Sequence, residues 1–521
     1  MAGGAIAVIT RIIGGGAVLV ALLAFSFATV IAVALHGDGL GTLGSYDWQA
    51  VRFTIWQALA SAGLSVGIAV PVARALARQD FKGRSLLITL LGAPFILPVI
   101  VGVLGLLAVF GRAGWISQGL DLFGLGRLSI YGPVGVILAH VFFNLPLATR
   151  FILQGWTSIP TDRFRVADSL GAQPWTQFQL IEWPMLRAML PGAFLLIFLL
   201  CLTSFAVALA VGGGPRGTTI ELAIYQSFRL DFDLGKASSL ALIQFLICGT
   251  VATLAILIPL PRNDGHGLGL IHTRQDVQSN RIVDFGFISI TAVFLILPLA
   301  SILIRGAIHL PDLPNAIFAA AWTSLWIAMI STSLCIGMAL SLALSFARTG
   351  QTTQKLVEVV GILGLATSPL VVGTGLFLMI FPFAHPMSLA IPVTAMVNAM
   401  MALPFALRVL IPEIRDTYVD YIRLRDSLMM SSGTWLWKII LPRLSKPLGF
   451  AAGLAAALSM GDLGVIALFA DPDLQTLPLM LYRLMGAYKM DQAAAVAVVL
   501  VAQSLALFWI FDRGGRPHAT S

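Results

Sequence analysis

Long apolar runs alternate with short polar stretches along the whole chain. A run of about 20 apolar residues is long enough for an α-helix to cross the hydrocarbon core of a bilayer. Hydropathy predicts about twelve such helices, so the chain is expected to be an all-α polytopic membrane protein. The predicted spans lie near 6–35, 52–76, 86–110, 131–153, 190–211, 238–260, 283–304, 321–347, 356–381, 387–411, 447–470 and 492–511.

The composition agrees with lipid as the solvent. Of 521 residues, 58% are hydrophobic and 11% are charged, whereas soluble domains carry about 25% charged residues. The first apolar run is too long for a signal peptide and lacks a small-residue cleavage pattern, so we expect an uncleaved first span. The 7 His show no metal-ligand spacing. Cys201, Cys248 and Cys335 each lie in an apolar run, where cysteines act as small core residues.

Two polar segments interrupt the apolar pattern at equivalent places. The first polar segment is Arg165–Pro184, and the second polar segment is Arg423–Pro442. At one constant spacing the following residues coincide: Asp168 with Asp426, Ser169 with Ser427, Leu170 with Leu428, Thr176 with Thr434, Ile181 with Ile439, and Pro184 with Pro442. Chance similarity among apolar sequences would not align polar residues and prolines in this way. The pairing therefore indicates an internal repeat.

The match continues outside these segments. The stretch LPLATR at 145–150 matches LPFALR at 403–408. We predict a first repeat at 1–260, a polar linker at 261–281 and a second repeat at 282–521. Each repeat has an even number of predicted spans, so the two copies share one orientation and are related by an axis along the membrane normal. A transport pathway is then expected at the interface between the repeats.

Basic residues indicate how the chain is oriented in the membrane. The chain has 32 Lys and Arg against 24 Asp and Glu. If the amino terminus is cytoplasmic, most of the basic residues fall on the cytoplasmic side, as the positive-inside rule requires. Both polar segments, the linker and both termini are then predicted to be cytoplasmic. The basic excess indicates membrane orientation and does not indicate a nucleic-acid partner.

The first polar segment is expected to form a helix–turn–helix at the membrane surface. Arg165–Leu170 contains neither Gly nor Pro and favours a helix, which Gly171 and Pro174 then break. A second short helix is predicted to begin at Trp175 and to end at Pro184.

Apolar residues of this second short helix share one face in both copies. Phe178 and Ile181 have helical spacing, and so do Leu436 and Ile439. A small apolar knob between charged flanks fits a groove on a soluble partner. The alternative is an ordinary amphipathic surface loop.

The spacing of Gly171, Ile181 and Pro184 resembles the loop that couples importer permeases to ATP-binding-cassette ATPases. The pattern of that loop is Glu-Ala-Ala, three residues, Gly, nine residues, Ile, one residue, Leu-Pro. Both copies here lack the acidic first residue, and the second copy has Met429 at the Gly position, so the resemblance implies two unequal docking sites. By this resemblance the coupling residues are Arg165, Ala167, Asp168, Gly171, Phe178, Ile181, Pro184, Arg423, Asp426, Leu436, Ile439, Leu441 and Pro442.

A wider resemblance covers nearly the whole chain. Segments 52–76, 95–99, 140–150, 212–226, 459–469 and 476–482 resemble the fused permease of bacterial thiamine importers. The resemblance implies a bacterial inner-membrane protein with two copies of a cytoplasmic ATPase subunit, which hold ATP-Mg, and a periplasmic thiamine-binding protein. It implies no cofactor on this chain. The permease of a ferric-iron importer, which can also be fused in two halves, is the alternative.

Asp462 is the main candidate for the substrate path. It lies within a predicted span, where a charge costs about 2.5–3.5 kcal/mol and indicates function. Gly461 and Gly464 leave room for an unwound turn that lines a cavity. The alternative is a structural Asp that caps a broken helix. Its equivalent in the first repeat is Ser204, which Phe205 follows.

Glu221, Tyr225 and Tyr482 are predicted on the outer side. They are candidates for a gate or docking ridge, although tyrosines also gather at membrane interfaces without such a role. A secondary transporter would need intramembrane acids or a His relay, and the chain has few of these. The sequence shows no pairing of a nucleophile with a base that would indicate an enzyme.

Overall fold

The computed structural model describes residues 17–22, 24–25, 28–33, 41–92, 96–127, 129–212, 214–257, 281–346, 368–469 and 474–515. Residues 17–257 of this set are called the first half, and residues 281–515 the second half. The predicted linker, except Arg281, lies outside the described residues. Parts of the first and ninth predicted spans also lie outside them.

Within the described residues the chain is helical, and 10 helices are long and apolar enough to cross a membrane. The prediction of an all-α polytopic membrane protein is therefore confirmed. The first half contains α2 (Ser45–Arg78), α3 (Arg84–Leu90), α4 (Val99–Phe110), α5 (Trp115–Leu122), α6 (Pro133–Thr157), α7 (Thr161–Ser169), α8 (Pro174–Gln177), η2 (Phe178–Glu182), α9 (Trp183–Leu202), α10 (Phe205–Val211), η3 (Pro215–Gly217), α11 (Ile220–Arg229) and α12 (Leu234–Leu257). The second half contains α13 (Arg281–Ile308), η4 (Leu310–Asp312), α14 (Ile317–Phe346), α16 (Pro369–Ile380), η5 (Pro386–Leu389), α17 (Ala390–Ser427), α18 (Ser432–Trp435), η6 (Leu436–Ile440), α19 (Leu441–Met460), α20 (Gly464–Phe469), α21 (Leu477–Gly486) and α22 (Met490–Gly514).

The two halves pack equivalent helices in the same way. Helix α2 packs on α6 and α9, just as α14 packs on α17 and α19. A buried hydrogen bond is repeated as well. The Thr54 hydroxyl accepts from the Ile220 N–H at 2.8 Å, and the Ser324 hydroxyl accepts from the Leu477 N–H at 2.9 Å. Each bond ties the long second helix of its half to the start of α11 or α21.

The helix at the start of each half, residues 28–33 in the first half and α13 in the second, packs against a helix of the other half. A Cβ on Gly105 of α4 would lie 2.7 Å from the Pro298 carbonyl oxygen of α13. At the equivalent place in α16, a Cβ on Gly375 would collide with the backbone of Thr29. Small residues permit such close helix approach in membranes. Helices of the two halves therefore pack against each other across the boundary between the predicted repeats.

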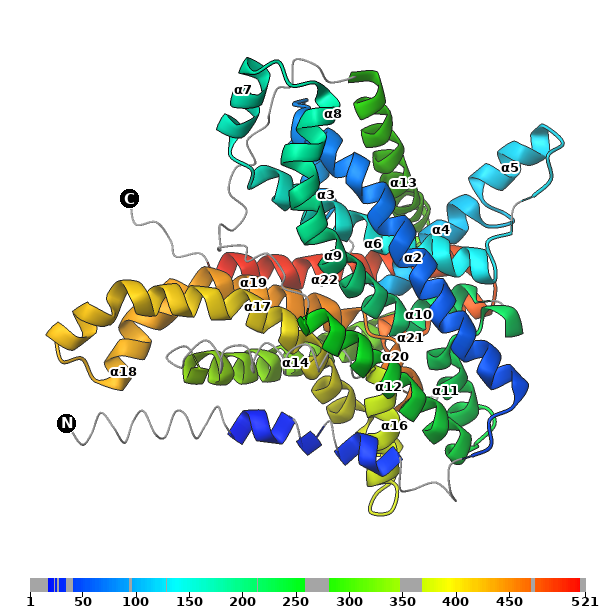
Figure 1. Cartoon of the computed structure of the whole chain (residues 1–521). Coiled ribbons are helices and arrows are strands. Elements are labelled where there is room, and N and C mark those ends of the chain that lie inside the picture. Colours follow the sequence, from blue (N-terminus) through cyan, green and yellow to red (C-terminus); the bar gives the residue numbers. More distant parts are fainter. Residues whose placement is uncertain are drawn as a thin grey trace.

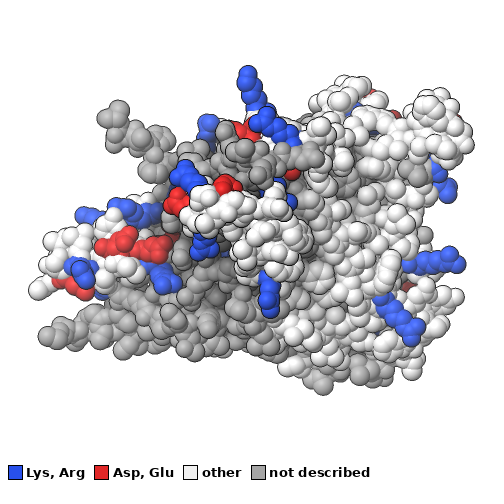
Figure 2. Space-filling view, turned by 45° about the horizontal axis from the view of Figure 1, so that its top comes forward, with Lys and Arg blue, Asp and Glu red and all other residues white. Residues whose placement is uncertain are grey.

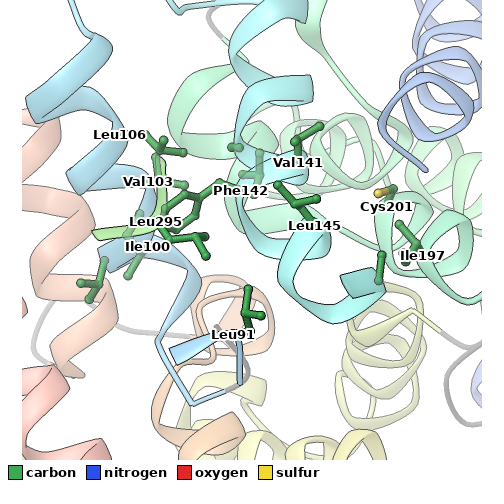
Figure 3. Close-up of a cluster of buried hydrophobic side chains, with 14 of the residues drawn as sticks. Leu91, Ile100, Val103, Leu106, Val141, Phe142, Leu145, Ile197, Cys201 and Leu295 are labelled. Atoms are coloured by element: carbon green, nitrogen blue, oxygen red, sulfur yellow. The ribbon is translucent and has the colours of Figure 1, made fainter. Parts of the chain in front are cut away.

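The largest cluster of buried apolar side chains includes residues from both halves. Figure 3 shows Leu295 of α13 among Ile100, Val103 and Leu106 of α4. Nearby, the Phe294 ring lies 5.7 Å from the Phe142 ring, centroid to centroid. The three cysteines are buried, as predicted. They are Cys201, Cys248 and Cys335.

The charged ends of the helices lie together. Figure 1 places α7, α8 and α18 toward one end of the long helices, whereas α5 and α11 lie toward the other end. In Figure 2 most charged side chains gather on the left of the view, several Lys and Arg lie at its right edge, and a broad uncharged surface lies between them. This distribution suits a helix bundle whose middle contacts lipid and whose charged end contacts water.

Three predicted spans are interrupted. The span predicted at 86–110 is divided between α3 and α4. Pro98 directly precedes α4, a place that suits proline better than the interior of a helix. The span at 190–211 breaks at Thr203 and Ser204, and the span at 447–470 breaks after Met460. A fourth span, 387–411, is part of the 38-residue helix α17.

Candidate functional site

The turn of the first polar segment is a helix C-cap built on Gly171. Gly171 has a φ of 69°, in the left-handed region. The Ala172 N–H donates to the Ala167 carbonyl at 3.0 Å, and the Gly171 N–H donates to the Asp168 carbonyl at 3.0 Å. This pair of bonds is the Schellman motif, which satisfies the last carbonyls of a helix. The predicted break at Gly171 is confirmed.

The second polar segment makes the same turn without glycine. Met429 has a φ of 47°. The Met430 N–H donates to the Arg425 carbonyl at 3.0 Å, and the Met429 N–H donates to the Asp426 carbonyl at 3.3 Å. The two turns therefore follow the same backbone path, so the missing glycine does not make their geometry unequal. A residue other than glycine is strained in this region.

The helix after each turn contains a π-helical stretch at the same place. The stretches are Phe178–Glu182 and Leu436–Ile440. The prediction that the short helix ends at Pro184 is wrong, because the chain continues through the π-helix into α9. Pro184 lies in the first turn of α9, where a missing N–H is tolerated. Pro442 lies in the first turn of α19.

The helix that leads into each turn differs between the halves. In the first half, α6 ends at Thr157 and Pro160 directly precedes α7, because a residue before proline avoids the helical conformation. The equivalent of Pro160 is Tyr418, and α17 runs through it without a break. Figure 1 shows α17 carrying α18 well away from the bundle. The two polar segments therefore differ in the helix that leads into the turn, which is broken in the first half and continuous in the second.

The apolar residues that the sequence placed on one face turn toward the bundle. Phe178 and Ile181 are half-buried, as are Leu436 and Ile439. Phe178 packs on the large apolar cluster to which both halves contribute, and Leu436 and Ile439 pack on a second cluster. These three side chains therefore face the bundle, and a docking knob at this place stays a prediction. The exposed large apolar side chains are Val166, Leu170, Trp175, Leu180 and Trp183 in the first segment and Leu424, Leu428, Met429 and Trp437 in the second.

The other predicted coupling residues lie around these turns. They are exposed except for two half-buried positions. The exposed ones are Arg165, Asp168, Gly171, Pro184, Arg423, Asp426 and Pro442, and the half-buried ones include Ala167 and Leu441. Asp168 accepts a hydrogen bond of 2.6 Å from the Gln177 side chain, which ties the two arms of the first turn together.

Different buried side chains join the two polar segments to the helix bundle. Under the first, Glu182 is 1% exposed and forms ion pairs with Arg74 and Arg78 of α2. Under the second, Trp435 is fully buried, and its ring lies 5.7 Å from the Tyr418 ring. Sequence reasoning missed both supports. An acid next to a predicted membrane span was the one signal that pointed to Glu182.

Asp462 lies in the gap between two helices. Helix α19 ends at Met460 and α20 begins at Gly464. The Asp462 Oδ1 atom accepts from the Gly464 N–H at 3.1 Å, so the carboxylate caps α20. Both the predicted unwound turn and the alternative of a helix cap are therefore present. The Asp462 Oδ2 atom is buried and has no hydrogen-bond partner within the described part of the chain.

Asp462 lines a small pocket that has both polar and apolar residues in its wall. Among its lining residues are Thr394 and Thr476, whose hydroxyls are buried and also lack a partner among the residues described. Ser459 lines it too and accepts a hydrogen bond of 3.1 Å from the Asn398 side chain. The pocket therefore places a carboxylate among hydroxyls inside the second half.

Residues from both halves meet next to Asp462. A Cβ on Gly464 would lie 3.7 Å from Asp462 Oδ1 and 3.7 Å from the Phe205 ring. The Phe205 ring in turn lies 5.3 Å from the Tyr225 ring, centroid to centroid. Burial raises the pKa of the Tyr482 phenol, and the nearby Tyr225 raises it further. The structure therefore brings three predicted path residues, Asp462, Phe205 and Tyr225, together across the interface between the halves, and Tyr482 lies near Tyr225.

Two further predicted path residues, Ser204 and Glu221, lie in the first half. Ser204 occupies the N-cap position of α10, in the first-half break that is equivalent to the break at Asp462. Glu221 is fully buried and accepts a hydrogen bond of 3.0 Å from the Gln244 side chain. The prediction that Glu221 contributes to an exposed docking ridge is therefore wrong, because its carboxylate faces the helix packing of α12.

The chain is similar over nearly its whole length to membrane subunits of known transport systems. It is 38% identical over 486 residues to the thiamine transport system permease protein ThiP of Salmonella typhimurium, which covers 91% of this chain and 90% of the relative. It is 37% identical over 523 residues to the protein of that name from Brucella abortus, which covers 97% of this chain and 95% of the relative.

The chain belongs to the thiamine transport permease family. The protein of the same name from Escherichia coli is 38% identical over 480 residues, which covers 90% of this chain and 89% of the relative. No model of a protein family matches the chain. The family relation confirms the resemblance drawn from the sequence, and it does not favour the ferric-iron alternative.

Proposed function

We propose that this chain is the membrane subunit of an ATP-driven importer that moves thiamine, and its phosphate esters, from the periplasm to the cytoplasm. The observation that carries the proposal is the similarity to thiamine transport permeases along both halves of the chain. The chain is proposed to lie in the bacterial inner membrane with both termini in the cytoplasm.

The proposal includes partners that supply energy and substrate. Two copies of a cytoplasmic ATPase subunit, each with ATP-Mg, would bind the exposed apolar side chains of the two polar segments. Trp175, Trp183 and Trp437 are the largest of these side chains. A periplasmic thiamine-binding protein would deliver substrate to the opposite end. No cofactor, catalytic role or nucleic-acid contact is proposed for this chain.

The two repeats, 1–260 and 282–521, are proposed to move against each other. Closure of the ATPase subunits would draw the polar segments together, and the interface would then open alternately to each side. The continuous helix from the π-helix into α9 or α19 supports this coupling, because movement of either segment displaces a helix that reaches the interface.

The residues around Asp462 are proposed to contact the substrate. Thiamine carries a fixed positive charge on an aromatic ring. A carboxylate next to aromatic faces suits such a cation, because the faces of aromatic rings attract positive charge. Asp462 supplies the charge, and Phe205, Tyr225 and Tyr482 supply rings from both halves.

Uptake in a deletion strain tests the proposed function. A bacterium that lacks its own thiamine permease and cannot make thiamine would express this chain with its ATPase and binding protein. Labelled thiamine should accumulate, and labelled ferric iron should not. Accumulation of iron without thiamine would reject the proposed substrate.

A further inference from the structure

A buried carboxylate joins the first polar segment to the transmembrane bundle. Glu182, the last residue of η2, is 1% exposed. Its two oxygens accept from two arginines of α2. The Arg74 Nε atom lies 2.7 Å from Glu182 Oε2, and the Arg78 side chain lies 3.2 Å from Glu182 Oε1. Charge-assisted bonds of this kind fix geometry, since each oxygen has its own donor.

Arg74 also contacts the ring next to the exposed surface of the segment. Its guanidinium lies 5.2 Å from the centre of the Phe178 ring. That ring stacks on Trp175 at 5.4 Å, and Trp175 is 66% exposed. A displacement of the exposed Trp175 is therefore passed to α2 through one stacked ring and one guanidinium.

The same end of α2 continues the connection into the second half. The Gln79 side chain donates to the Asp284 carboxylate of α13 at 2.8 Å. Close by, the Phe81 and Phe285 rings are in edge contact at 5.8 Å. Helix α2 is thus tied at its charged end to the first polar segment on one side and to α13 on the other.

The second polar segment has an apolar support instead. The residue equivalent to Glu182 is Ile440, which is fully buried. Trp435 is also fully buried there, and the Arg425 guanidinium lies 5.9 Å from its ring. Packing of this kind resists displacement through shape, whereas an ion pair resists it through charge and direction.

We infer that Glu182, held by Arg74 and Arg78, is a positioning residue that transmits movement of the first polar segment to α2 and α13. The inference rests on the proposed function, in which an ATPase subunit moves this segment. Movement of the first polar segment would therefore reach the bundle through ion pairs, and movement of the second polar segment through packed apolar side chains.

The test compares transport per ATP hydrolysed in vesicles that contain the complete complex. The variants are Glu182→Gln and the double variant Glu182→Gln with Arg74→Gln. Glu182→Gln takes the carboxylate away from both arginines, whereas the double variant also removes the charge of Arg74, so that Arg78 alone keeps a charge that faced Glu182. The double variant therefore keeps the test valid if the single variant does not assemble. Asp491→Asn is the control, because it removes a carboxylate from a half-exposed pair with Arg305 at the opposite end.

The expected result is that both Glu182 variants retain the ATPase subunit and hydrolyse ATP, while transport per ATP falls at least several-fold. The double variant should be no worse than the single one, Glu182→Asp should recover part of the ratio, and the control should match the unmodified complex. A normal ratio in the double variant would overturn the inference. Absence of thiamine transport in the unmodified complex would reject the proposed function instead.

Discussion

Met429 and Gly171 occupy the same position in two copies of one turn, and both have a positive φ, 47° and 69°. The hydrogen bonds around them are also the same. Glycine adopts this conformation without steric cost, whereas a residue with a Cβ is strained. The second polar segment therefore keeps its turn at the expense of some stability.

Relief of this strain should be measurable. Met429→Gly is expected to stabilise the purified protein by up to about 1 kcal/mol, because the left-handed conformation costs a side chain about 1–2 kcal/mol and the added chain freedom of glycine offsets part of the gain. Thermal unfolding in detergent measures this change. Gly171→Met is the matched reverse exchange and should lower the melting temperature. A lower melting temperature for Met429→Gly would mean that the Met429 side chain has a stabilising contact.

Variants of Trp435 and Trp175 distinguish a residue that stabilises a polar segment from a residue that binds the ATPase subunit. Trp435→Ala removes a fully buried ring and is expected to destabilise the protein by about 3–5 kcal/mol. Trp175→Ala removes a ring that is 66% exposed, so it should change stability little and should weaken binding of the ATPase subunit. Thermal unfolding and co-purification with the ATPase measure the two effects. Loss of ATPase binding without loss of stability in Trp435→Ala would contradict this assignment.

The sequence predicts the parts of the polar segments that local chemistry determines. Gly171 and Pro174 both disfavour the helix interior and lie three residues apart, so the turn is predictable. The left-handed conformation of Met429 is not predictable from the sequence. A residue with a side chain is normally strained in this conformation, so the surrounding helices must hold the backbone of Met429 in place. Glu182 meets Arg74 and Arg78 only in the folded bundle. Contacts between residues so far apart in the chain leave no local pattern.

The same division holds in the membrane. Gly461 and Gly464 predict the break around Asp462, because an unwound turn needs room. The contact of Gly464 with Phe205 depends on how the two halves approach each other. The exchange of first helices between the halves is equally hidden, since Gly105 and Gly375 are ordinary residues in apolar runs.

Asp462→Asn should separate the charge of Asp462 from its capping role. Asparagine caps helices about as well as aspartate, so the hydrogen bond from the Gly464 N–H should persist and the protein should fold normally. If the charge contacts a cationic substrate, substrate-stimulated ATP hydrolysis and transport should both fall by about tenfold or more, the equivalent of about 1.4 kcal/mol.

The matched control for Asp462→Asn is Ser204→Asn in the equivalent break of the first half. Ser204 occupies the N-cap position of α10 and its side chain makes no capping hydrogen bond, so this variant adds an amide and changes no charge. Stimulated hydrolysis in membrane vesicles is the measurement for both. Full stimulation and transport in Asp462→Asn would show that Asp462 acts only as a helix cap.

The exchange of first helices predicts that Gly105 and Gly375 cannot carry larger side chains. Gly105→Val would drive its methyl groups into the backbone of Pro298, and Gly375→Val would do the same at Thr29. Each change is expected to destabilise the protein by about 1–3 kcal/mol, the usual cost of overpacking. Gly63→Val is the control, because a Cβ on Gly63 would meet nothing within 4 Å. Thermal unfolding of the three variants measures the difference. Equal melting temperatures for all three would mean that the first helices do not cross between the halves in the membrane.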